Sequence, residues 1–158
     1  RKRGTSDMRA FLDTNVLIDL LTERPPEGAE AVKLLAMQEL GDVELWASAK
    51  SFTDMFYVMR EENPSEVVQQ AFIDSLEYLQ VCELGCEDIR AAAERKWTDF
   101  EDCLIDVCAE KIRADVLLTR DKDGFKQSRL KTASPKQMFL WLEEEMRLTY
   151  EVIDWPAY

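Results

Sequence analysis

Short apolar runs alternate with longer amphipathic stretches along most of the chain. The apolar runs have the length of buried strands and are bounded by polar or turn-forming residues. We therefore predict strands at residues 9–13, 43–47, 80–84 and 115–119, and a short fifth strand at 131–134.

The stretches between these runs carry apolar residues at helical spacing. Pro64 and Pro135 each open a helix, where proline is well tolerated. Gly41 ends one helix, and either Ser48 or Ser51 caps another. We predict helices at residues 14–21, 29–40, 52–62, 65–79, 86–97, 101–114 and 135–148.

This alternation of strands and helices predicts an α/β fold with a parallel sheet covered on both faces. The length of 158 residues and the absence of an internal repeat or linker indicate a single domain, which we expect to run from residue 8 to residue 148. We expect residues 1–7 to be an extension that precedes a natural start at Met8. Residues 149–158 form a C-terminal tail, rich in aromatic residues, without a predicted structure.

The charge and the residue types narrow the chemistry. A formal net charge of −12 argues against a general nucleic-acid binder, and it fits either an acidic surface or a cluster of carboxylates that bind metal. The chain has no histidine, which excludes Ser-His-Asp hydrolases and most zinc enzymes. Its four cysteines lack the C-x2-C spacing of zinc and redox motifs.

The same composition bears on location. No stretch approaches the roughly 20 apolar residues of a membrane helix, and no hydrophobic region follows the basic N-terminus. Free thiols are typical of reducing compartments. We therefore expect a cytoplasmic protein.

Carboxylates interrupt the pattern where strands end and helices begin. Asp13 ends the first predicted strand, and Asp121 follows the fourth. Asp54 lies early in the third predicted helix, and Asp99 and Asp102 lie at the start of the sixth. Each has an ordinary explanation on its own: a helix cap for Asp99, a favourable helix dipole for Asp102, a turn for Asp121 and solvent for Asp54.

Together these acids favour a shared site. Ligands of parallel α/β sheets bind beyond the carboxyl ends of the strands. Carboxylates that converge there repel one another unless a cation is present. With no histidine available, an all-oxygen donor set selects Mg²⁺ or Mn²⁺, and paired ions about 3.5–4 Å apart can clamp a phosphodiester. We therefore interpret Asp13 as a metal ligand.

Three segments carry a resemblance to a known family. "FLDTNVLIDLL", "SFTDMFYVMR" and "DFEDCLIDVCAEKIRADVLLTRDKDGF" resemble the PIN-domain family in order, spacing and local sequence. The resemblance extends from about residue 8 to residue 142. It implies a three-layer α/β/α sandwich with a central, mostly parallel sheet of four to five strands. It also implies an Mg²⁺- or Mn²⁺-dependent endoribonuclease, and many bacterial members are toxins of the VapC kind.

Carried over to this chain, the resemblance assigns roles to individual residues. It makes Asp13, Asp102 and Asp121 the metal ligands and adds Asp54 as a fourth catalytic acid. It also implies supporting or substrate-binding residues: Asn15, Thr119, Arg120 and Asp99, with Asp123 as a weaker candidate.

One position departs from the family pattern. The second acidic position is typically glutamate, and here it is Asp54, whose side chain is one methylene shorter. Either Asp54 reaches the metal through water, or activity is reduced. Alternatively, Glu61 or Glu62 takes this position, although both lie too far along the helix for the usual geometry.

The segment from Arg120 to Lys136 is the most basic part of the chain body. It either follows an RNA backbone beside the acids or forms an ordinary solvated loop. We expect Phe125 and Tyr57 to be core or edge residues, although each could stack on a base.

Two other functions compete with a nuclease. One is a catalytically weak or inactive module of the same fold that binds RNA or a protein. The other is phosphotransfer through an aspartyl-phosphate at Asp13. The second function is disfavoured because haloacid-dehalogenase-like enzymes place another aspartate where this chain has Asn15.

The resemblance also implies partners: an antitoxin protein and a second copy in a homodimer. The loop at residues 22–30 and the helix near residues 67–79 offer apolar surface for such contacts.

Overall fold

Five parallel strands form the centre of the structure, a computed structural model that describes residues 8–23 and 25–151. Their order in the sheet is β3-β2-β1-β4-β5. The predicted α/β fold with a parallel sheet is thereby confirmed. The strands are β1 (Met8–Leu12), β2 (Val43–Ser48), β3 (Leu79–Cys82), β4 (Val116–Leu118) and β5 (Thr132–Ala133).

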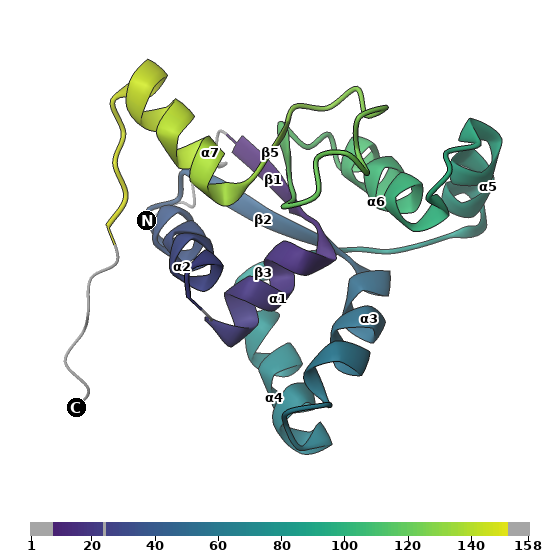
Figure 1. Ribbon diagram of the computed structural model, residues 1–158, viewed down its shortest axis with the longest axis horizontal. Coiled ribbons are helices and arrows are strands. Elements are labelled where there is room, and N and C mark those ends of the chain that lie inside the picture. The colour runs from purple at the N-terminus through teal and green to yellow at the C-terminus, as the bar shows by residue number, and fades with distance from the viewer. Residues whose placement is uncertain (1–7, 24, 152–158) are drawn as a thin grey trace.

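Helices cover both faces of this sheet, as Figure 1 shows. One face packs against α1, α2 and α7 in a large apolar core. The other face packs against α6, and α5 packs on α6 in turn. The helices are α1 (Thr14–Thr22), α2 (Glu27–Glu39), α3 (Ala49–Met59), α4 (Ser65–Ser75), α5 (Cys86–Arg95), α6 (Phe100–Lys111) and α7 (Pro135–Trp141).

The alternation of side chains along β1 explains the two cores. Ala10 and Leu12 point into the larger core, and Phe11 points into the core beneath α6. Because β1 is central, both faces and both edges of the strand are buried, which suits its uninterrupted apolar sequence. Phe125, from the loop after β4, completes the second core, as predicted, whereas Tyr57 is exposed.

The site region lies at the topological switch point of the sheet. The chain leaves β1 for β2 on one side, and β4 later pairs with β1 on the other, with Leu12 opposite Leu118. The backbone N–H of Asp13 donates to the carbonyl of Leu118 at 2.9 Å. The residues that follow β1 and β4 are therefore neighbours.

Several element boundaries differ from the prediction. Helix α4 ends at Ser75, not at residue 79, because Leu79 pairs with Leu45 and begins β3. Ser48, one of the two predicted caps, starts α3 by accepting from the backbone N–H of Lys50. The last helix is regular only to Trp141 and continues over Leu142–Met146 as a wider π-type turn.

Part of the C-terminal tail is described and lies against the domain. The Tyr150 hydroxyl donates to Asp42 at 2.8 Å, and its ring lies 5.9 Å from that of Phe139. The remaining aromatic residues of the tail, and residues 1–7, lie outside the described part of the chain. Among the described helices, none is both long and apolar enough to cross a membrane.

Candidate functional site

Asp13 is buried at the end of β1, where its carboxylate is held from several sides. Its side chain is only 7% exposed. One oxygen accepts the backbone N–H of Thr14 at 2.7 Å and so caps α1. The other accepts the Asn15 amide at 2.9 Å and the Thr119 hydroxyl at 2.7 Å. The carboxylate thus has a fixed orientation.

Asn15 and Thr119 join the ends of β1 and β4 at this point. The Asn15 side-chain oxygen accepts the backbone N–H of Arg120 at 3.2 Å. The Thr119 hydroxyl oxygen accepts the backbone N–H of Asp121 at 2.9 Å. Both side chains therefore link Asp13 to the segment that carries Asp121.

Asp99 and Asp102 come from the start of α6. Asp99 caps the helix, with one oxygen accepting from the backbone N–H groups of Glu101 and Asp102 at 2.9 and 3.1 Å. Asp102 then lies in the first turn with its side chain partly buried. The cap explanation for Asp99 is consistent with a site here, because it fixes the backbone that carries Asp102.

Gly124 lies directly against two of the acids. The Asp121 side chain accepts the backbone N–H of Gly124 at 3.2 Å. A Cβ atom at Gly124 would stand 2.2 Å from an Asp102 carboxylate oxygen and 3.2 Å from an Asp121 oxygen. Both carboxylates therefore reach the same point beside this glycine, and a larger residue would fill it.

Burial and the proximity of these charges shift the pKa values of the acids. Burial, together with the negative charges of Asp99, Asp13, Asp121 and Glu101, raises the pKa of Asp102 to about 6. Burial also raises the pKa of Asp13; hydrogen bonds oppose this shift, and Glu101 and Asp121 add to it. Asp13, Asp102 and Asp121 are thus brought together at one end of the sheet.

The Asp54 carboxylate pairs with a lysine of its own helix. It forms a close ion pair with Lys50, four residues earlier on α3. The same ammonium group lies 3.1 Å from Glu101 at the start of α6. Asp54 therefore borders the cluster through Lys50, and Lys50 supplies a positive charge at its rim.

Lys50 and Glu101 are not among the predicted site residues. Glu101 directly precedes Asp102, and its charge acts on both Asp13 and Asp102. Lys50 and Asp54 have the i,i+4 spacing at which charged side chains meet on a helix. That spacing is the one signal in the sequence that points to Lys50.

The other candidates lie on the loop after β4. The Arg120 guanidinium pairs with Asp19 of α1 at 2.8 Å. Asp123 is exposed, as are Lys122 and Lys126. This loop is anchored by Ser128, whose hydroxyl donates to the buried Asp106 of α6.

The donors around Asp13 suit a hard divalent cation in their chemistry. Every oxygen is a carboxylate, hydroxyl or amide oxygen, as Mg²⁺ and Mn²⁺ prefer, and the space beside Gly124 lies between two carboxylates. As the side chains lie, however, no three acidic or cysteine side chains within residues 8–23 and 25–151 are close enough to hold an ion together. The fit is therefore one of donor type, and Asp102 and Asp121 reach the same point beside Gly124.

Comparison with known proteins gives the family and the fold. The profile of the PIN domain matches residues 9–123, while the comparison with curated proteins returns no match. Among solved structures, VapBC-1 from nontypeable Haemophilus influenzae is similar, with a TM-score of 0.62 and 20% identity over 82% of this chain and 99% of that chain.

Two further structures are similar at the same level. VapC20 from Mycobacterium tuberculosis, described as a toxin that cleaves the sarcin-ricin loop, has a TM-score of 0.60 and 14% identity over 75% of this chain and 94% of that one. PAE2754 from Pyrobaculum aerophilum has a TM-score of 0.60 and 16% identity over 90% and 100%. Identities this low show a shared fold. With the profile spanning most of the sequence, the chain belongs to the PIN-domain family.

Proposed function

We propose that this protein is an endoribonuclease that hydrolyses phosphodiester bonds of RNA and depends on Mg²⁺ or Mn²⁺. The observation that supports it most is the arrangement of acids beyond the ends of β1 and β4: the Asp13 carboxylate and the Asp121 backbone share the Thr119 hydroxyl, and Asp102 and Asp121 meet beside Gly124. Burial and the charges of its neighbours raise the pKa of Asp102 to about 6, and a bound cation would offset this repulsion. The fold shared with VapC20, described as a toxin that cleaves the sarcin-ricin loop, is consistent with this function.

In this proposal Asp13, Asp102 and Asp121 hold the ion. When bound, a divalent cation lowers the pKa of a water molecule and stabilises the charge that develops on the phosphate. Asn15 and Thr119 keep the Asp13 carboxylate oriented. Fixed partners of this kind typically change metal affinity or activity about 10- to 100-fold when removed.

The decisive experiment measures cleavage and metal binding in parallel. Labelled single-stranded RNA is incubated with the protein and Mn²⁺, and the metal affinity is determined by calorimetry. We expect cleavage by the wild type, and loss of both cleavage and affinity in Asp13→Asn and Asp121→Asn. Cleavage that persists in Asp13→Asn, or an unchanged metal affinity in both variants, would contradict the assignment.

The role of Asp54 needs its own comparison, because this residue pairs with Lys50. We propose that it acts as a fourth catalytic acid at the rim of the site. Asp54→Asn should lower the cleavage rate, whereas Asp54→Glu, which restores the family's usual residue, should keep or raise it. Asp74→Asn on α4 is the matched control, because this carboxylate also has a partner four residues earlier, Gln70. Equal rates for Asp54→Asn and wild type would remove Asp54 from the mechanism.

A second candidate function is an inactive PIN-fold module that binds RNA or protein. The ion pair between Asp54 and Lys50, and the lack of a complete ligand cluster among the described residues, favour it. This candidate predicts no cleavage of any RNA under conditions in which the folded protein binds Mn²⁺. The same cleavage and calorimetry data therefore separate the two functions.

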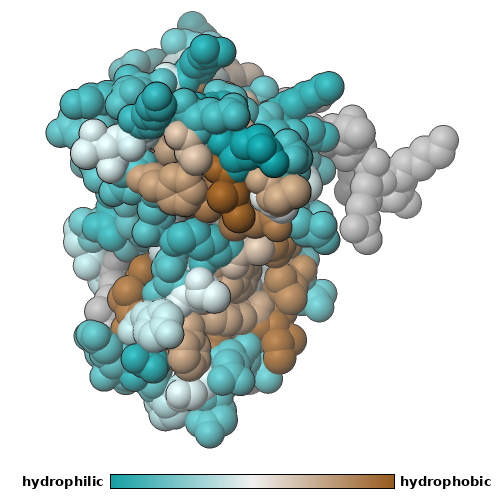
Figure 2. Space-filling model, turned by 90° about the vertical axis from the view of Figure 1, so that its right-hand side faces the viewer, coloured by the Kyte–Doolittle hydropathy of each residue, from teal (hydrophilic) through white to brown (hydrophobic). Residues whose placement is uncertain are grey.

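We further propose an antitoxin protein and a second copy of the chain as partners, in the cytoplasm. VapBC-1 shares the fold of this chain, and another similar structure is a toxin–antitoxin complex from Klebsiella pneumoniae. Figure 2, which faces the side of the molecule that carries α3, α4 and α5, shows apolar surface between polar regions. Exposed large apolar residues on these helices are Tyr57, Val58, Val67, Ile73 and Ile89. Surface of this kind marks protein contacts, and light scattering, alone and with a co-expressed partner, tests them.

A further inference from the structure

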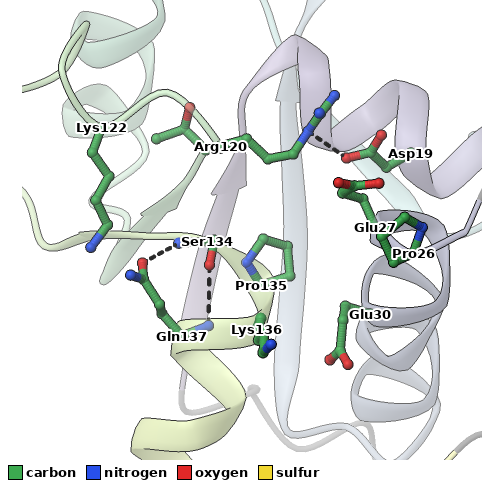
Figure 3. A pocket seen from close by; sticks show the side chains of 11 residues that line it. Asp19, Pro26, Glu27, Glu30, Arg120, Lys122, Ser134, Pro135, Lys136 and Gln137 are labelled. Atoms are coloured by element: carbon green, nitrogen blue, oxygen red, sulfur yellow. Dashed lines mark hydrogen bonds and ion pairs between the residues drawn. The ribbon is translucent and has the colours of Figure 1, made fainter.

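A cavity of about 450 Å³ opens beside the candidate site. It lies between the α1–α2 segment and the start of α7, and Figure 3 shows its lining residues. Thr119 is shared by the cavity and the candidate site: it lines the cavity, and its hydroxyl donates a hydrogen bond to Asp13. A volume in this range accommodates a small ligand, and a ligand here lies next to the acids.

Figure 3 shows Lys122 and Glu27 on opposite walls of this cavity, with Lys136 between them below Pro135. Lys122, Lys136 and Gln137 come from the loop after β4 and from α7, and Glu27 and Glu30 come from α2. A ligand that spans the cavity therefore meets cations at one end and carboxylates at the other. Such a ligand carries an anionic group and a set of hydrogen-bond donors.

The partners of these side chains show which are available. Asp19 is neutralised by Arg120 at 2.8 Å, and Glu30 pairs with Lys33 at 3.2 Å. Within residues 8–23 and 25–151, Glu27 has no hydrogen bond or ion pair of its side chain, and neither has Lys122. Among the described residues that line the cavity, the Glu27 carboxylate and the ammonium groups of Lys122 and Lys136 are thus left to meet a ligand.

Two prolines supply the apolar surface between these ends. Pro26 precedes Glu27 on one wall, and Pro135 is buried at the start of α7 on the other. In Figure 3 the Pro135 ring lies between the cationic and acidic walls. Rigid apolar rings of this kind can pack against a planar base or a ribose.

We propose that this cavity binds one nucleotide of single-stranded RNA, with its phosphate toward Lys122 and Lys136 and its base edge toward Glu27. The proposal rests on the ribonuclease function above and names the part of the substrate that the site recognises. Guanine is the preferred base, because its N1–H and N2–H donors lie side by side and match both oxygens of one carboxylate. Adenine and cytosine offer an amino group alone, and uracil offers one N–H between two carbonyls.

The test measures binding without cleavage. The four ribonucleoside 5′-monophosphates are titrated into the full chain in EDTA, and the affinities are followed by NMR chemical shifts. We expect GMP to bind about tenfold more tightly than UMP. Glu27→Gln should abolish this preference, whereas Glu66→Gln, in the first turn of α4, should keep it. Lys122→Ala should weaken all four nucleotides alike, and Lys126→Ala, on the same loop, should not.

Equal affinity for the four nucleotides, no measurable binding, or a guanine preference that survives in Glu27→Gln would overturn the proposal. The failure of the ribonuclease function looks different. In that case GMP binding and its dependence on Glu27 remain, but RNA is not cleaved when Mn²⁺ is added. Cleavage without base preference would leave the nuclease in place and remove the guanine pocket.

Discussion

The Thr119 hydroxyl donates to the Asp13 carboxylate at 2.7 Å and thereby joins the end of β4 to the end of β1. The two residues lie 106 positions apart in the sequence. Thr119 is fully buried, and its oxygen also accepts the backbone N–H of Asp121. One side chain thus orients two of the candidate metal ligands.

Thr119→Val removes this hydroxyl while nearly preserving the shape of the side chain. We expect the free energy of unfolding to fall by about 1–3 kcal/mol, because polar groups of Asp13 and Asp121 lose a partner. Mn²⁺ affinity should fall at least about tenfold. Denaturant titration and calorimetry measure the two effects. In Thr53→Val, which removes a hydroxyl that donates to a carbonyl of its own helix, the metal affinity should not change; a similar loss there would contradict the special role of Thr119.

Gly124→Ala places a methyl group between Asp102 and Asp121. Since the added Cβ would stand 2.2 Å from Asp102, that carboxylate must rotate away from the shared point. We expect Mn²⁺ affinity to fall at least about tenfold with little change in the free energy of unfolding. Gly85→Ala is the control, because its added Cβ meets nothing nearer than 3.8 Å. Wild-type affinity in Gly124→Ala would show that no ion binds at this point.

The raised pKa of Asp102 predicts how stability depends on pH in the metal-free protein. The folded state keeps the proton on Asp102 up to pH about 6, whereas the unfolded chain releases it near about pH 4. The contribution of this group to stability is therefore complete below about pH 4, decreases as the pH rises from about 4 to about 6, and stays low above that range. Asp102 is partly exposed, so solvent screening reduces the effect to about 1 kcal/mol.

Asp102→Asn removes this pH-dependent repulsion. Near neutral pH in EDTA the variant should be more stable than the wild type, and the difference should disappear at about pH 4. Mn²⁺ should reverse the order near neutral pH by stabilising the wild type. Urea denaturation across this pH range gives the free energies. A variant that is less stable than the wild type near neutral pH in EDTA would show that Asp102 is not under electrostatic strain.

Asp106 anchors the loop after β4 through Ser128. Its buried carboxylate accepts from Arg95 at 2.8 Å and from the hydroxyl of Ser128. Asp106→Ala leaves both donors without this partner, and we expect a loss of about 1–3 kcal/mol. Ser128→Ala should cost less, because Asp106 keeps Arg95. Limited proteolysis should cut the loop at Lys122 or Lys126 faster in both variants; unchanged cutting would mean that other contacts hold the loop.

Much of the fold follows from local patterns in the sequence. The strand and helix positions are recognisable because buried strands and amphipathic helices have different apolar spacing. The spacing places the end of α4 too late because Leu76 continues the helical pattern, and only the pairing of Leu79 with β2 ends the helix. Such tertiary contacts have no local signature.

The sequence alone is enough to predict which acids of the candidate site follow strands. Asp13 and Asp121 stand out because each carries a charge close to the end of a buried apolar run. The ion pairs of Lys50 and the space beside Gly124 depend on how α3, α6 and the loop after β4 meet. The same holds for the cavity near Glu27, whose walls come from segments far apart in the sequence, as expected for a site at a switch point.

The adjacency of β1 and β4 determines when the acidic centre comes into existence. A ribosome delivers Asp13 long before Leu118, whose carbonyl accepts the Asp13 backbone N–H. Until that strand docks, β1 has an open edge and the nascent polypeptide carries an incomplete set of carboxylates. Translation products that stop before β4 should therefore lack the complete acidic centre, whereas any product that includes β4 and the loop after it can form the centre.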